Sequence, residues 1–403
     1  MNIYVYENTA LSKFYPLSST KASFEFRISS DTFLDRIKRT FSDCKINLFV
    51  REELRDIVSH RHPDLEVNPK NIEDGLWLVG NAVWNNKTIP NYNNEMVFFE
   101  NKNCVGAYLK EQSGKHFLYN NFSHKKLKSI ESKRIDIILC RYLWDIIDYI
   151  GKNINNDKKY FADQGNLSSN FKFFKRNSER LINSQNILTG KVEIQPNVVL
   201  DATSGPIIID DNVTIKSNTH LEGPLYVGNG STISPLSYVK NSVIGPMCKI
   251  GGELNSVVIE GYTNKVHYGF LGNSYIGEWV NLGAGTTNSN LKNNYGKVRV
   301  QMNDKVFETN KIHLGCFIGD YVKTSIGTKI NTGSVIGPGS MIFSKDFPSK
   351  NIPILTWYTD SGMARVRIDK FILNCHRMKK RRGVDFDIVE EQFYRNLFLK
   401  VEK

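Results

Sequence analysis

The sequence predicts an N-terminal α/β domain, then a left-handed parallel β-helix of hexapeptide repeats, and finally C-terminal helices. Three observations lead to this prediction. An aliphatic residue recurs every six positions in the second half, strand-like and helix-like segments alternate in the first 150 residues, and 403 residues exceed the length of one ordinary domain. The predicted boundaries are 1–160 for the α/β domain, 161–186 for a linker, 187–345 for the β-helix and 346–403 for a helical extension.

The six-residue period decides the fold of the second half, because it fits neither an α-helix nor an open sheet. It fits a triangular coil in which each hexapeptide supplies one flat face and one corner, and the aliphatic side chain points into a narrow prism. Glycine, asparagine and aspartate tolerate tight corners and follow many of these residues. The series comprises Leu188, Ile194, Leu200, Ile209, Ile215, Leu221, Val227, Ile233, Val239, Ile244, Ile250, Ile276, Leu282, Ile312, Ile318, Thr324, Ile330, Ile336 and Ile342.

Some segments of the second half depart from this period. Residues 251–275 fit the repeat only loosely, and residues 287–311 form a polar insertion of the kind that often carries function on a rigid scaffold. After the β-helix, residues 363–383 predict an amphipathic helix with a basic C-terminal end, and residues 386–400 predict a second helix. We expect these helices to cap the last coil or to form contacts between subunits.

The first 150 residues alternate between strand-like and helix-like segments, which is typical of an α/β layer with a mainly parallel sheet. Residues 135–154, IDIILCRYLWDIIDYIGKNI, predict an amphipathic helix that closes the domain, and the polar stretch at 153–170 predicts the linker. The other predicted strands are residues 3–7, 45–51 and 76–84, and the other predicted helices are residues 31–41 and 52–58.

The composition of the chain limits the classes of protein to which it can belong. The formal net charge is +12, but the basic residues are scattered and lack the interleaved aromatic residues of a nucleic-acid stacking platform. Two explanations remain: a basic site for phosphorylated ligands, or a general abundance of lysine and asparagine in the source organism. No apolar run is long enough for membrane insertion, and the N-terminus does not resemble a signal peptide. The six cysteines lie far apart, so we expect reduced, mostly buried thiols in a cytoplasmic protein.

Two segments are similar to a known family. The stretch GYTNKVHYGFLGNSYIGEWVNLGAGTTNSNLKNNYG at 261–296 resembles the acetyltransferase core of the bifunctional N-acetylglucosamine-1-phosphate uridyltransferase/glucosamine-1-phosphate acetyltransferase. It resembles more closely a divergent bacterial branch of that family, described as sugar nucleotidyltransferases. The segment SKFYPLSSTKASFEFR at 12–27 is similar to the N-terminal pattern of the same branch. The resemblance implies a nucleotidyltransferase-like α/β domain and an acyltransferase-type β-helix that forms a homotrimer.

The resemblance also implies site residues in the β-helix. In the family, a histidine before an aromatic-Leu-Gly stretch acts as general base, and His267 matches it. Asn281 and Asn290 match family asparagines that contact the sugar amine and the phosphate region, and Lys265 matches a basic residue near the phosphate. Where the family has an aromatic residue after the second asparagine, this chain has Leu291, which leaves the identity of the sugar open.

Acyl transfer to an amine needs a base that removes the amine proton and a hydrogen-bond donor that steadies the oxyanion. His267 is the candidate base, and the neighbouring Tyr268 is a further candidate for substrate binding. The alternatives are that His267 is a packed or surface histidine and that Asn281 is a corner residue stacked in the prism. The polar run around Asn290 has the alternative of a simple surface loop.

The co-substrate implied by this chemistry is acetyl-CoA or another acyl-CoA, lying in the groove between neighbouring β-helices of the trimer. Its phosphates need cations, and the candidates for binding it are Lys323 and Arg365, together with Lys329 and Arg367. For each of them taken singly, the alternative is a solvated basic surface.

The N-terminal domain departs from the pattern of sugar-1-phosphate nucleotidyltransferases. These enzymes open with a Gly-rich loop whose backbone N–H groups hold the nucleotide phosphates, whereas the loop at 7–23 contains no glycine. Where an aspartate that binds Mg²⁺ is expected, this chain has Asn81, a weaker ligand for Mg²⁺. Lys13, Lys21 and Arg27 match basic positions of the branch and are candidates for phosphate contact, with surface charge as the alternative.

These features leave three hypotheses. The first is a sugar-phosphate enzyme that transfers an acyl group from a CoA thioester to an amino sugar phosphate in the β-helix, with sugar-1-phosphate nucleotidyl transfer, or a remnant of it, in the N-terminal domain. The second is a single-activity sugar-1-phosphate nucleotidyltransferase whose β-helix only assembles the oligomer. The third is a non-catalytic scaffold that binds a sugar nucleotide.

Overall fold

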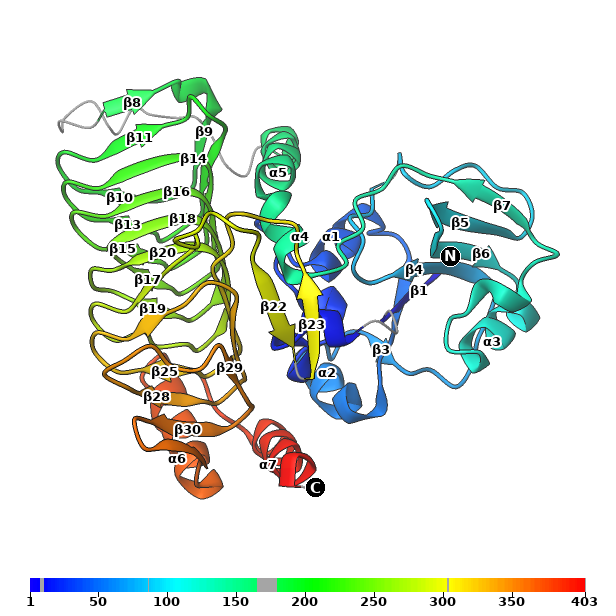
Figure 1. Ribbon diagram of the computed structural model, residues 1–403. Coiled ribbons are helices and arrows are strands. Elements are labelled where there is room, and N and C mark those ends of the chain that lie inside the picture. The colour runs from blue at the N-terminus through cyan, green and yellow to red at the C-terminus, as the bar shows by residue number, and fades with distance from the viewer. Residues whose placement is uncertain (8–10, 86, 165–179, 303, 403) are drawn as a thin grey trace.

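The computed structural model describes residues 1–7, 11–85, 87–164, 180–302 and 304–402, and it places two units side by side (Figure 1). Within these residues, the first unit is built on a seven-stranded sheet of order β3-β2-β1-β4-β6-β5-β7. The first four strands in this order are parallel, whereas β6 runs antiparallel to both β4 and β5. The α/β class is confirmed, with a mixed sheet in place of a mainly parallel one. The strands are β1 (Asn2–Tyr6), β2 (Lys45–Phe49), β3 (Glu66–Val67), β4 (Gly75–Val79), β5 (Met96–Glu100), β6 (Asn103–Leu109) and β7 (Glu131–Arg134).

Helices connect these strands where the sequence provides start signals. α1 begins after Thr32, whose hydroxyl accepts a hydrogen bond from the Asp35 N–H at 3.1 Å while the Asp35 carboxylate accepts one from the Thr32 N–H at 3.0 Å. This reciprocal pair satisfies two N–H groups that an α-helix leaves without partners. The helices of the sheet unit before residue 120 are α1 (Phe33–Thr40), α2 (Arg55–Arg61) and α3 (Glu111–Tyr119).

The prediction of one helix over residues 135–154 is wrong in its first half. Residues 137–140 run extended beside the end of β4, where the Val83 N–H donates to the Ile138 carbonyl and the Cys140 N–H donates to the Asn81 carbonyl. An apolar run suits a buried extended segment as well as a helix, and these partners decide between them. The helices that follow are α4 (Leu143–Asp148) and α5 (Ile150–Gln164). The predicted linker at 153–170 is therefore helical up to Gln164, and residues 165–179 lie outside the described residues.

The second unit is a parallel β-helix with three faces. Face 1 contains the strands that stack through β10, β13, β15, β17 and β19, continue at Asn281 and end with β25, β28 and β30. Face 2 contains the first halves of β14, β16, β18 and β20, and face 3 contains their second halves together with β24, β27 and β29. The strands are β8 (Arg180–Ile182), β9 (Ile187–Thr189), β10 (Glu193–Ile194), β11 (Val199–Asp201), β12 (Ile207–Ile209), β13 (Thr214–Ile215), β14 (His220–Val227), β15 (Thr232–Ile233), β16 (Tyr238–Ile244), β17 (Lys249–Ile250), β18 (Glu253–Gly261), β19 (Asn264–Lys265), β20 (Phe270–Glu278), β21 (Thr287–Asn288), β24 (Cys316–Ile318), β25 (Lys323–Thr324), β26 (Lys329–Ile330), β27 (Ser334–Ile336), β28 (Met341–Phe343), β29 (Asn351–Ile352) and β30 (Thr356–Thr359).

The predicted aliphatic column fills the prism. The six residues that carried the prediction are fully buried in one core cluster, and they are Ile209, Ile215, Leu221, Val227, Ile233 and Val239. For two other residues of the predicted series, the prediction that the side chain points into the prism is wrong. Leu188 points outward, because it stands between Ile187 and Thr189 on a strand whose alternate residues face opposite sides. Ile312 is 46% exposed, because it lies beyond the inserted segment and outside the coils.

The β-helix is longer and more regular than predicted. β8 already pairs with β11, so the coils begin at residue 180 rather than 187. Residues 251–275 are ordinary coils, shortened because Val239 pairs with Leu254 only 15 positions later instead of 18. The polar insertion at 287–311 contains the hairpin of β22 (Arg299–Met302) and β23 (Lys305–Glu308), which projects toward the first unit (Figure 1).

C-terminal helices follow the last coil, as predicted. The strand β31 (Gly362–Arg365) turns back on β30, and α6 (Ile368–Lys380) and α7 (Ile388–Glu402) come after it. They cover a ladder of corner residues in which Tyr262 and Trp279 stack at 4.4 Å and Tyr321 packs on Phe371 of α6. α7 also contacts α2, so the helices cap the side of the prism and tie it to the first unit.

The two units share one hydrophobic core. α4 and α5 pack on face 3, where outward side chains of successive coils are buried together with the core of the sheet unit. These residues are Leu188, Ile208, Tyr226, Val243, Val258, Tyr275, Phe317 and Val335. The β-helix and the α/β domain are therefore packed as one body rather than held only by a linker.

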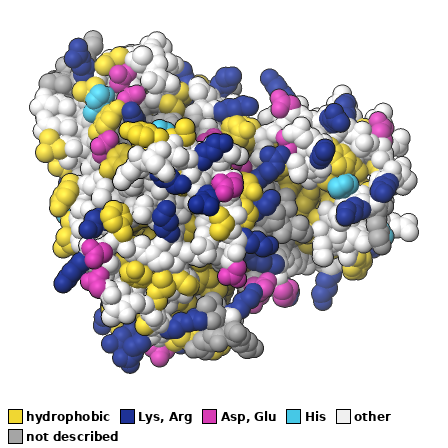
Figure 2. Space-filling view, in the orientation of Figure 1, with side chains coloured by type: hydrophobic (Ala, Val, Ile, Leu, Met, Phe, Trp, Pro, Cys, Tyr) yellow, Lys and Arg dark blue, Asp and Glu magenta, His cyan; other side chains and the backbone are white. Residues whose placement is uncertain are grey.

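The distribution of surface charge and the state of the cysteines agree with the predictions from composition. Lys and Arg side chains are spread over the visible face with Asp and Glu among them, rather than gathered in one patch (Figure 2). The six cysteines are unpaired, and four of them are buried. No helix in the described part of the chain is long and apolar enough to cross a bilayer.

Candidate functional site

His267 lies at an exposed corner of the prism, between face 1 and face 2. The turn joins β19 to β20, and both His267 and Tyr268 are exposed, Tyr268 by 74%. Gly269 closes the turn at a φ of +125°, and a Cβ there would stand 2.2 Å from the Thr286 carbonyl oxygen, so only glycine fits. This tight turn displays the imidazole on the outer surface, where a substrate can reach it.

Lys265 lies inside this corner and not on the surface, where contact with a phosphate was predicted. It takes an inward position of face 1, paired with Ile250, and is 2% exposed. Its ammonium donates to the Gly251 carbonyl at 2.7 Å and to the His267 carbonyl at 3.0 Å. Burial lowers the pKa of Lys265 to about 8. The structure therefore gives Lys265 the task of holding the backbone of the turn that carries His267.

The two predicted asparagines lie on the faces that meet at the His267 corner. Asn281 is exposed on face 1, so it is not stacked in the prism, and its carbonyl oxygen is 3.4 Å from the Asn264 amide nitrogen. Asn290 borders face 2, and its side-chain amide donates to the side-chain Oδ1 of Asn273 at 2.7 Å. Sequence reasoning missed Arg382, which follows α6, reaches face 1 and donates to the side-chain Oδ1 of Asn264 at 2.7 Å.

A basic pocket of about 480 Å³ opens farther along face 1, between the last coils and α6. It has three cationic side chains and no carboxylate, together with the partly exposed ring of Trp357. Its lining residues are Met341, Trp357, Ala364, Arg365, Val366, Arg367, Lys370, Phe371 and Asn374. We call it the end pocket. Its charge suits a phosphorylated ligand.

Of the predicted cations, Arg365 lines the end pocket, whereas Lys323 lies behind one of its lining residues. Lys323 pairs with Met341 of the pocket wall, and among the described residues its buried ammonium has no hydrogen-bond partner. Burial lowers the pKa of Lys323. Arg365 lines the pocket, with its guanidinium 6.0 Å from the centre of the Phe398 ring. Lys329, by contrast, lies over Phe347, away from this lining.

Lys21 and Arg27, predicted to contact phosphate, lie between the two units, where Lys21 is buried and Arg27 half-buried. The Lys21 ammonium lies 3.1 Å from Glu278 and 3.7 Å from Glu260 of the β-helix, and its side chain is 8% exposed. Burial opposes its charge, but these carboxylates and Asp320 raise the pKa of Lys21. Arg27 donates from Nε to the Glu260 carbonyl at 2.9 Å. Neither side chain is open to a phosphate in this structure.

A second part of the contact between the α/β domain and the β-helix surrounds Glu25. Arg61 lies 3.3 Å and His62 3.2 Å from its carboxylate. Although burial would raise the pKa of Glu25, the charge of Arg61 and the hydrogen bond with His62 lower it to about 2. Thr20 donates to the Asp320 carboxylate at 2.6 Å. The segment at 12–27 that resembles the family pattern is thus the segment that docks on the β-helix.

The remaining N-terminal candidates are also engaged with protein groups. Lys13 lies over the Tyr142 ring, 5.3 Å from its centre. Asn81 is 1% exposed and its side-chain amide donates to the Cys140 carbonyl at 2.6 Å, while its side-chain Oδ1 is buried without a partner in the described structure. Mg²⁺ prefers carboxylates and waters, and no group of three His, Cys, Asp or Glu able to hold a metal occurs among the described residues. The residues at Asn81 do not fit Mg²⁺.

The crevice where open α/β sheets bind ligands is filled in part by protein. This crevice lies outside the carboxyl ends of the parallel strands, at the point where the strand order reverses, here between β1 and β4. Gly80 follows β4, and a Cβ there would stand 2.9 Å from the Cβ of the fully buried Phe24. The loop after β1 therefore packs onto the end of β4.

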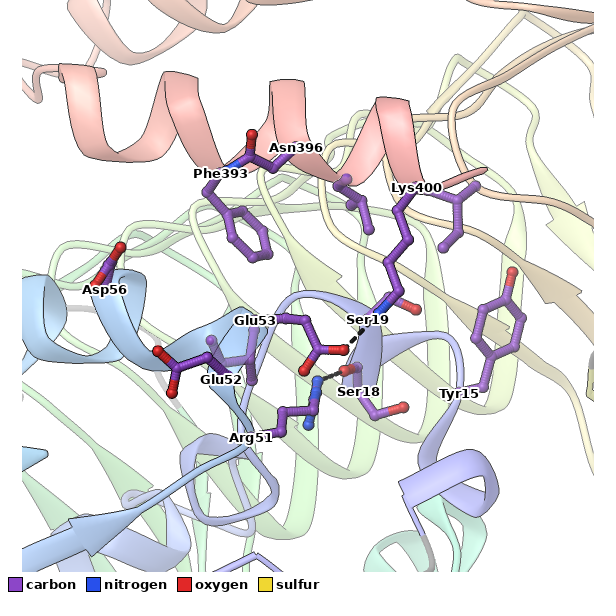
Figure 3. A pocket seen from close by; sticks show the side chains of 13 residues that line it. Tyr15, Ser18, Ser19, Arg51, Glu52, Glu53, Asp56, Phe393, Asn396 and Lys400 are labelled. Carbon is purple, nitrogen blue, oxygen red and sulfur yellow. Dashed lines mark hydrogen bonds and ion pairs between the residues drawn. The ribbon is translucent and has the colours of Figure 1, made fainter. Parts of the chain in front are cut away.

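An open pocket remains beside this crevice, where the loops after β1 and β2 face α7. It has a volume of about 630 Å³ and we call it the junction pocket (Figure 3). Its lining residues are Tyr15, Ser18, Ser19, Arg51, Glu52, Glu53, Leu54, Asp56, Ile354, Phe393, Asn396, Leu397 and Lys400. None of these residues was a candidate from the sequence, because they come together only through the docking of α7.

Comparison with known proteins agrees with the two-part structure. Residues 3–165 match the family model described as sugar nucleotidyl transferase. The chain is 36% identical over 170 residues to a bifunctional sugar-1-phosphate nucleotidylyltransferase/acetyltransferase of Sulfurisphaera tokodaii, covering 41% of this chain and 40% of the relative. It is 33% identical over 150 residues to the bifunctional protein GlmU of Thermodesulfovibrio yellowstonii, covering 36% of this chain and 30% of the relative.

The chain thus covers less than half the length of these relatives. Among solved structures, an Arabidopsis UDP-N-acetylglucosamine acyltransferase covers 49% of this chain and 76% of its own, at 13% identity and a TM-score of 0.23, which is too weak a likeness to bear on fold or function. The sequence matches, by contrast, concern named enzyme families. Residues 3–165 match the sugar nucleotidyl transferase family model, and parts of the chain are similar to bifunctional nucleotidylyltransferase/acetyltransferase proteins.

Proposed function

We propose that this chain is a transferase of sugar-phosphate metabolism, in which the β-helix moves an acyl group from a CoA thioester to the amine of an amino sugar phosphate. The observation that carries the proposal is the exposed imidazole of His267, at the edge of a face that leads to a basic pocket. The bifunctional nucleotidylyltransferase/acetyltransferase relatives support the same class of reaction. Because acyl-CoA and sugar phosphates are cytoplasmic metabolites, the proposed reaction belongs to the cytoplasm.

In the proposed reaction, His267 accepts the proton of the sugar amine as its nitrogen attacks the thioester carbonyl. The C–N bond forms, the C–S bond breaks, and the CoA thiolate leaves and takes up a proton. Asn281, on the neighbouring face, is the proposed donor to the oxyanion. Lys265 acts through the turn, because its hydrogen bond to the His267 carbonyl fixes the backbone that carries the base.

The end pocket is the proposed site for the phosphate-bearing end of acyl-CoA. From Asn264 to β30, face 1 spans four strand spacings, or roughly 19 Å, a distance that a long, thin thioester can bridge. Arg365, Arg367 and Lys370 supply positive charge, and Trp357 supplies an aromatic surface. Acetyl-CoA then lies along face 1 with its thioester at His267.

Arg367→Ala is expected to raise the KM for acetyl-CoA about tenfold with little change in kcat, because a charge-assisted hydrogen bond to a phosphate is lost far from the reacting atoms. Initial rates at varied acetyl-CoA measure both constants. Arg377→Ala provides the control, since Arg377 lies on α6, which Arg367 directly precedes, but outside the end pocket. A change confined to kcat would contradict the assignment of the pocket.

We propose a homotrimer, because the corner that carries His267 also exposes large apolar residues on separate coils. Leu236 is 78%, Tyr268 74% and Ile326 77% exposed, and each lies in a turn between face 1 and face 2. Such an edge favours burial against a second copy. A cleft between copies would then border the His267 corner.

Replacing Leu236 and Ile326 together by aspartate is expected to convert the trimer to a monomer, because each buried contact would become a charge at the interface. Sedimentation equilibrium measures the mass. Lys216→Asp is the control, because Lys216 follows face 1 on a coil next to that of Leu236. A wild-type chain of monomer mass over the whole concentration range would refute the trimer.

For the N-terminal domain we propose a degraded nucleotidyltransferase whose present task is docking. Lys21 and Arg27 are engaged by the β-helix, and Asn81 does not fit Mg²⁺. Two assays separate the hypotheses. Acetyl-CoA with a panel of amino sugar phosphates, followed by thiol release, tests acyl transfer; nucleoside triphosphate with sugar-1-phosphate, followed by pyrophosphate release, tests nucleotidyl transfer. Thiol release without pyrophosphate release is expected, and binding without turnover in both would favour the scaffold.

A further inference from the structure

The segment from α6 to Arg382 follows the edge of face 1 and brings positive charge to two places on it. Near the start of α6, Lys370 lines the end pocket. Just after the helix, Arg382 reaches Asn264, the residue three positions before His267. Between Asn264 and Met341 of the end pocket, face 1 spans three strand spacings, or roughly 14 Å. The proposed acyl transfer uses the end pocket but leaves Arg382 without a task.

Arg382 is held in position, yet its charge is not neutralised. The guanidinium donates from Nη1 to the Met247 carbonyl at 3.1 Å and from Nη2 to the Asn264 Oδ1 at 2.7 Å. Both acceptors are uncharged, and no carboxylate forms an ion pair with Arg382 within the described residues. Burial lowers the pKa of Arg382, as expected for a partly shielded cation. Because a guanidinium has five N–H donors, these two bonds leave donors for an anionic ligand.

Lys249 adds a second positive charge at the same end of face 1. It pairs with Asn264 across neighbouring strands, and it faces outward because the next residue, Ile250, fills the prism. The Lys249 side chain is exposed and forms no ion pair in the described part of the chain. Two cations without counter-charges therefore lie beside the coil that carries His267.

The acyl donor of the proposed reaction does not occupy this end of face 1. Its phosphates are assigned to the end pocket and its thioester to His267, so it extends from the His267 coil toward β30. Lys249 lies on the preceding coil, and Arg382 bridges that coil and the His267 coil. The substrate that remains for this end is the acceptor, the amino sugar phosphate.

The acceptor phosphate needs a cation other than Lys265. Lys265 is buried in the prism, where its ammonium donates to the Gly251 and His267 carbonyls. Arg382 approaches the same coil from outside the prism. Three residues of extended chain, roughly 10 Å, lead from Asn264 to His267, and a hexosamine phosphate carries its amine and its phosphate at separate positions of the sugar. A planar guanidinium also matches the geometry of phosphate oxygens.

We infer that Arg382, assisted by Lys249, binds the phosphate of the acceptor and so selects phosphorylated amino sugars over free ones. The amine of the acceptor then points along face 1 toward His267. The inference rests on the proposed function, which supplies the class of acceptor. It adds to that function a specificity-determining residue that comes from the C-terminal extension rather than from the β-helix.

Isothermal titration calorimetry on the full chain, without acetyl-CoA, tests the site with glucosamine-1-phosphate, glucosamine-6-phosphate and glucosamine. At least one phosphate should bind the wild type about tenfold more tightly than glucosamine, because a charge-assisted hydrogen bond is gained. Arg382→Met should remove most of this preference and leave the affinity for glucosamine unchanged. Arg382→Lys should keep part of it, because the charge stays while the planar fork is lost. Equal affinities of the wild type for all three sugars would overturn the inference.

Two further variants locate the binding. Lys380→Met removes another cation of α6, one that lines a separate pocket with His376 and Asp387, and it should leave the preference unchanged. Lys249→Met changes an exposed side chain, so the fold should tolerate it, and the preference should fall about threefold, as for one exposed charge. A preference for phosphate that survives in both Arg382→Met and Lys249→Met would place the phosphate elsewhere and overturn the inference.

Thiol release from acetyl-CoA, measured on the same proteins, separates this inference from the proposed function. Arg382→Met should raise the KM for the sugar phosphate about tenfold and leave the KM for acetyl-CoA unchanged, the reverse of Arg367→Ala. A wild type without thiol release, whose preference for phosphate still depends on Arg382, would refute acyl transfer and retain the phosphate site. An active wild type whose KM for the sugar phosphate is unchanged in Arg382→Met would refute the site alone.

Discussion

His267→Ala is expected to lower the rate of acyl transfer by about 10²–10⁴-fold, the range over which a positioned general base accelerates proton transfer. The loss should appear in kcat, because the base acts as the amine attacks and not when the substrates bind. The imidazole is on the surface, so its removal leaves the buried column of the prism intact. Thiol release from acetyl-CoA, measured at saturating substrates, gives the rate.

The same β-helix offers a matched control. His220 is another exposed histidine, at the start of β14 and on face 2, three coils before the His267 turn. His220→Ala should keep full activity, and both variants should have the circular dichroism and the mass of the wild type. A His267→Ala protein that retains more than about a third of the wild-type rate would remove His267 from the mechanism, because a general base contributes at least about a hundredfold.

Lys21→Met is expected to destabilise the chain by about 3–5 kcal/mol, the cost of leaving buried carboxylates without their cation. Glu260 and Asp320 are buried beside Lys21, and burial already raises the pKa of both carboxyls. Burial also acts on Glu278, but Lys21 and Arg61 hold the pKa of that carboxyl below its usual value. Without Lys21 the three carboxylates would repel one another in the contact between the units.

The effect of this variant should depend on pH with a definite sign. Removing the cation raises the pKa of the folded carboxyls above their values in the unfolded chain. A group of this kind contributes stability below its unfolded pKa and loses it as the pH rises through its folded pKa. Lys21→Met should therefore lose more stability at pH 8 than at pH 5, as measured by urea unfolding.

Two further variants test the cause. Lys38→Met removes an exposed ion pair with Asp64 and should change the stability by less than about 1 kcal/mol. Adding Glu278→Gln to Lys21→Met should restore part of the loss, because one unpaired charge disappears. A Lys21→Met protein as stable as Lys38→Met at pH 8 would contradict the docking role.

The resemblance at 12–27 shows how a motif can be recognised and its task still be misread. Lys21 and Arg27 stand at positions where the family pattern is basic, and the sequence suggested phosphate as their partner. The structure pairs them instead with Glu260 and Glu278, more than 200 positions away in the chain. A basic side chain has the same local sequence signal whether its counter-charge belongs to a ligand or to another part of the protein.

The prediction of one helix over 135–154 is wrong in its first half for a related reason. The spacing of its apolar residues suits a helix. In the structure, however, the Val83 N–H donates to the Ile138 carbonyl and the Cys140 N–H donates to the Asn81 carbonyl, across the end of the sheet. An apolar segment can be buried equally well as a helix or as an extended segment, so the long-range hydrogen-bond partners decide which of the two forms. The junction pocket lay beyond prediction as well, because Tyr15, Asp56 and Phe393 meet only after α7 has docked.

The sequence by itself determined the β-helix, because a six-residue period places most of its aliphatic side chains in the prism through local geometry, as Ile215 and Ile233 show. Gly269 marks the turn that carries His267, but the sequence left open whether that histidine is packed or exposed. Only the tertiary structure decided which charges meet, that Lys265 points inward, and that the two units share a core. These outcomes depend on contacts between distant segments, and no local pattern encodes the partner of a charge.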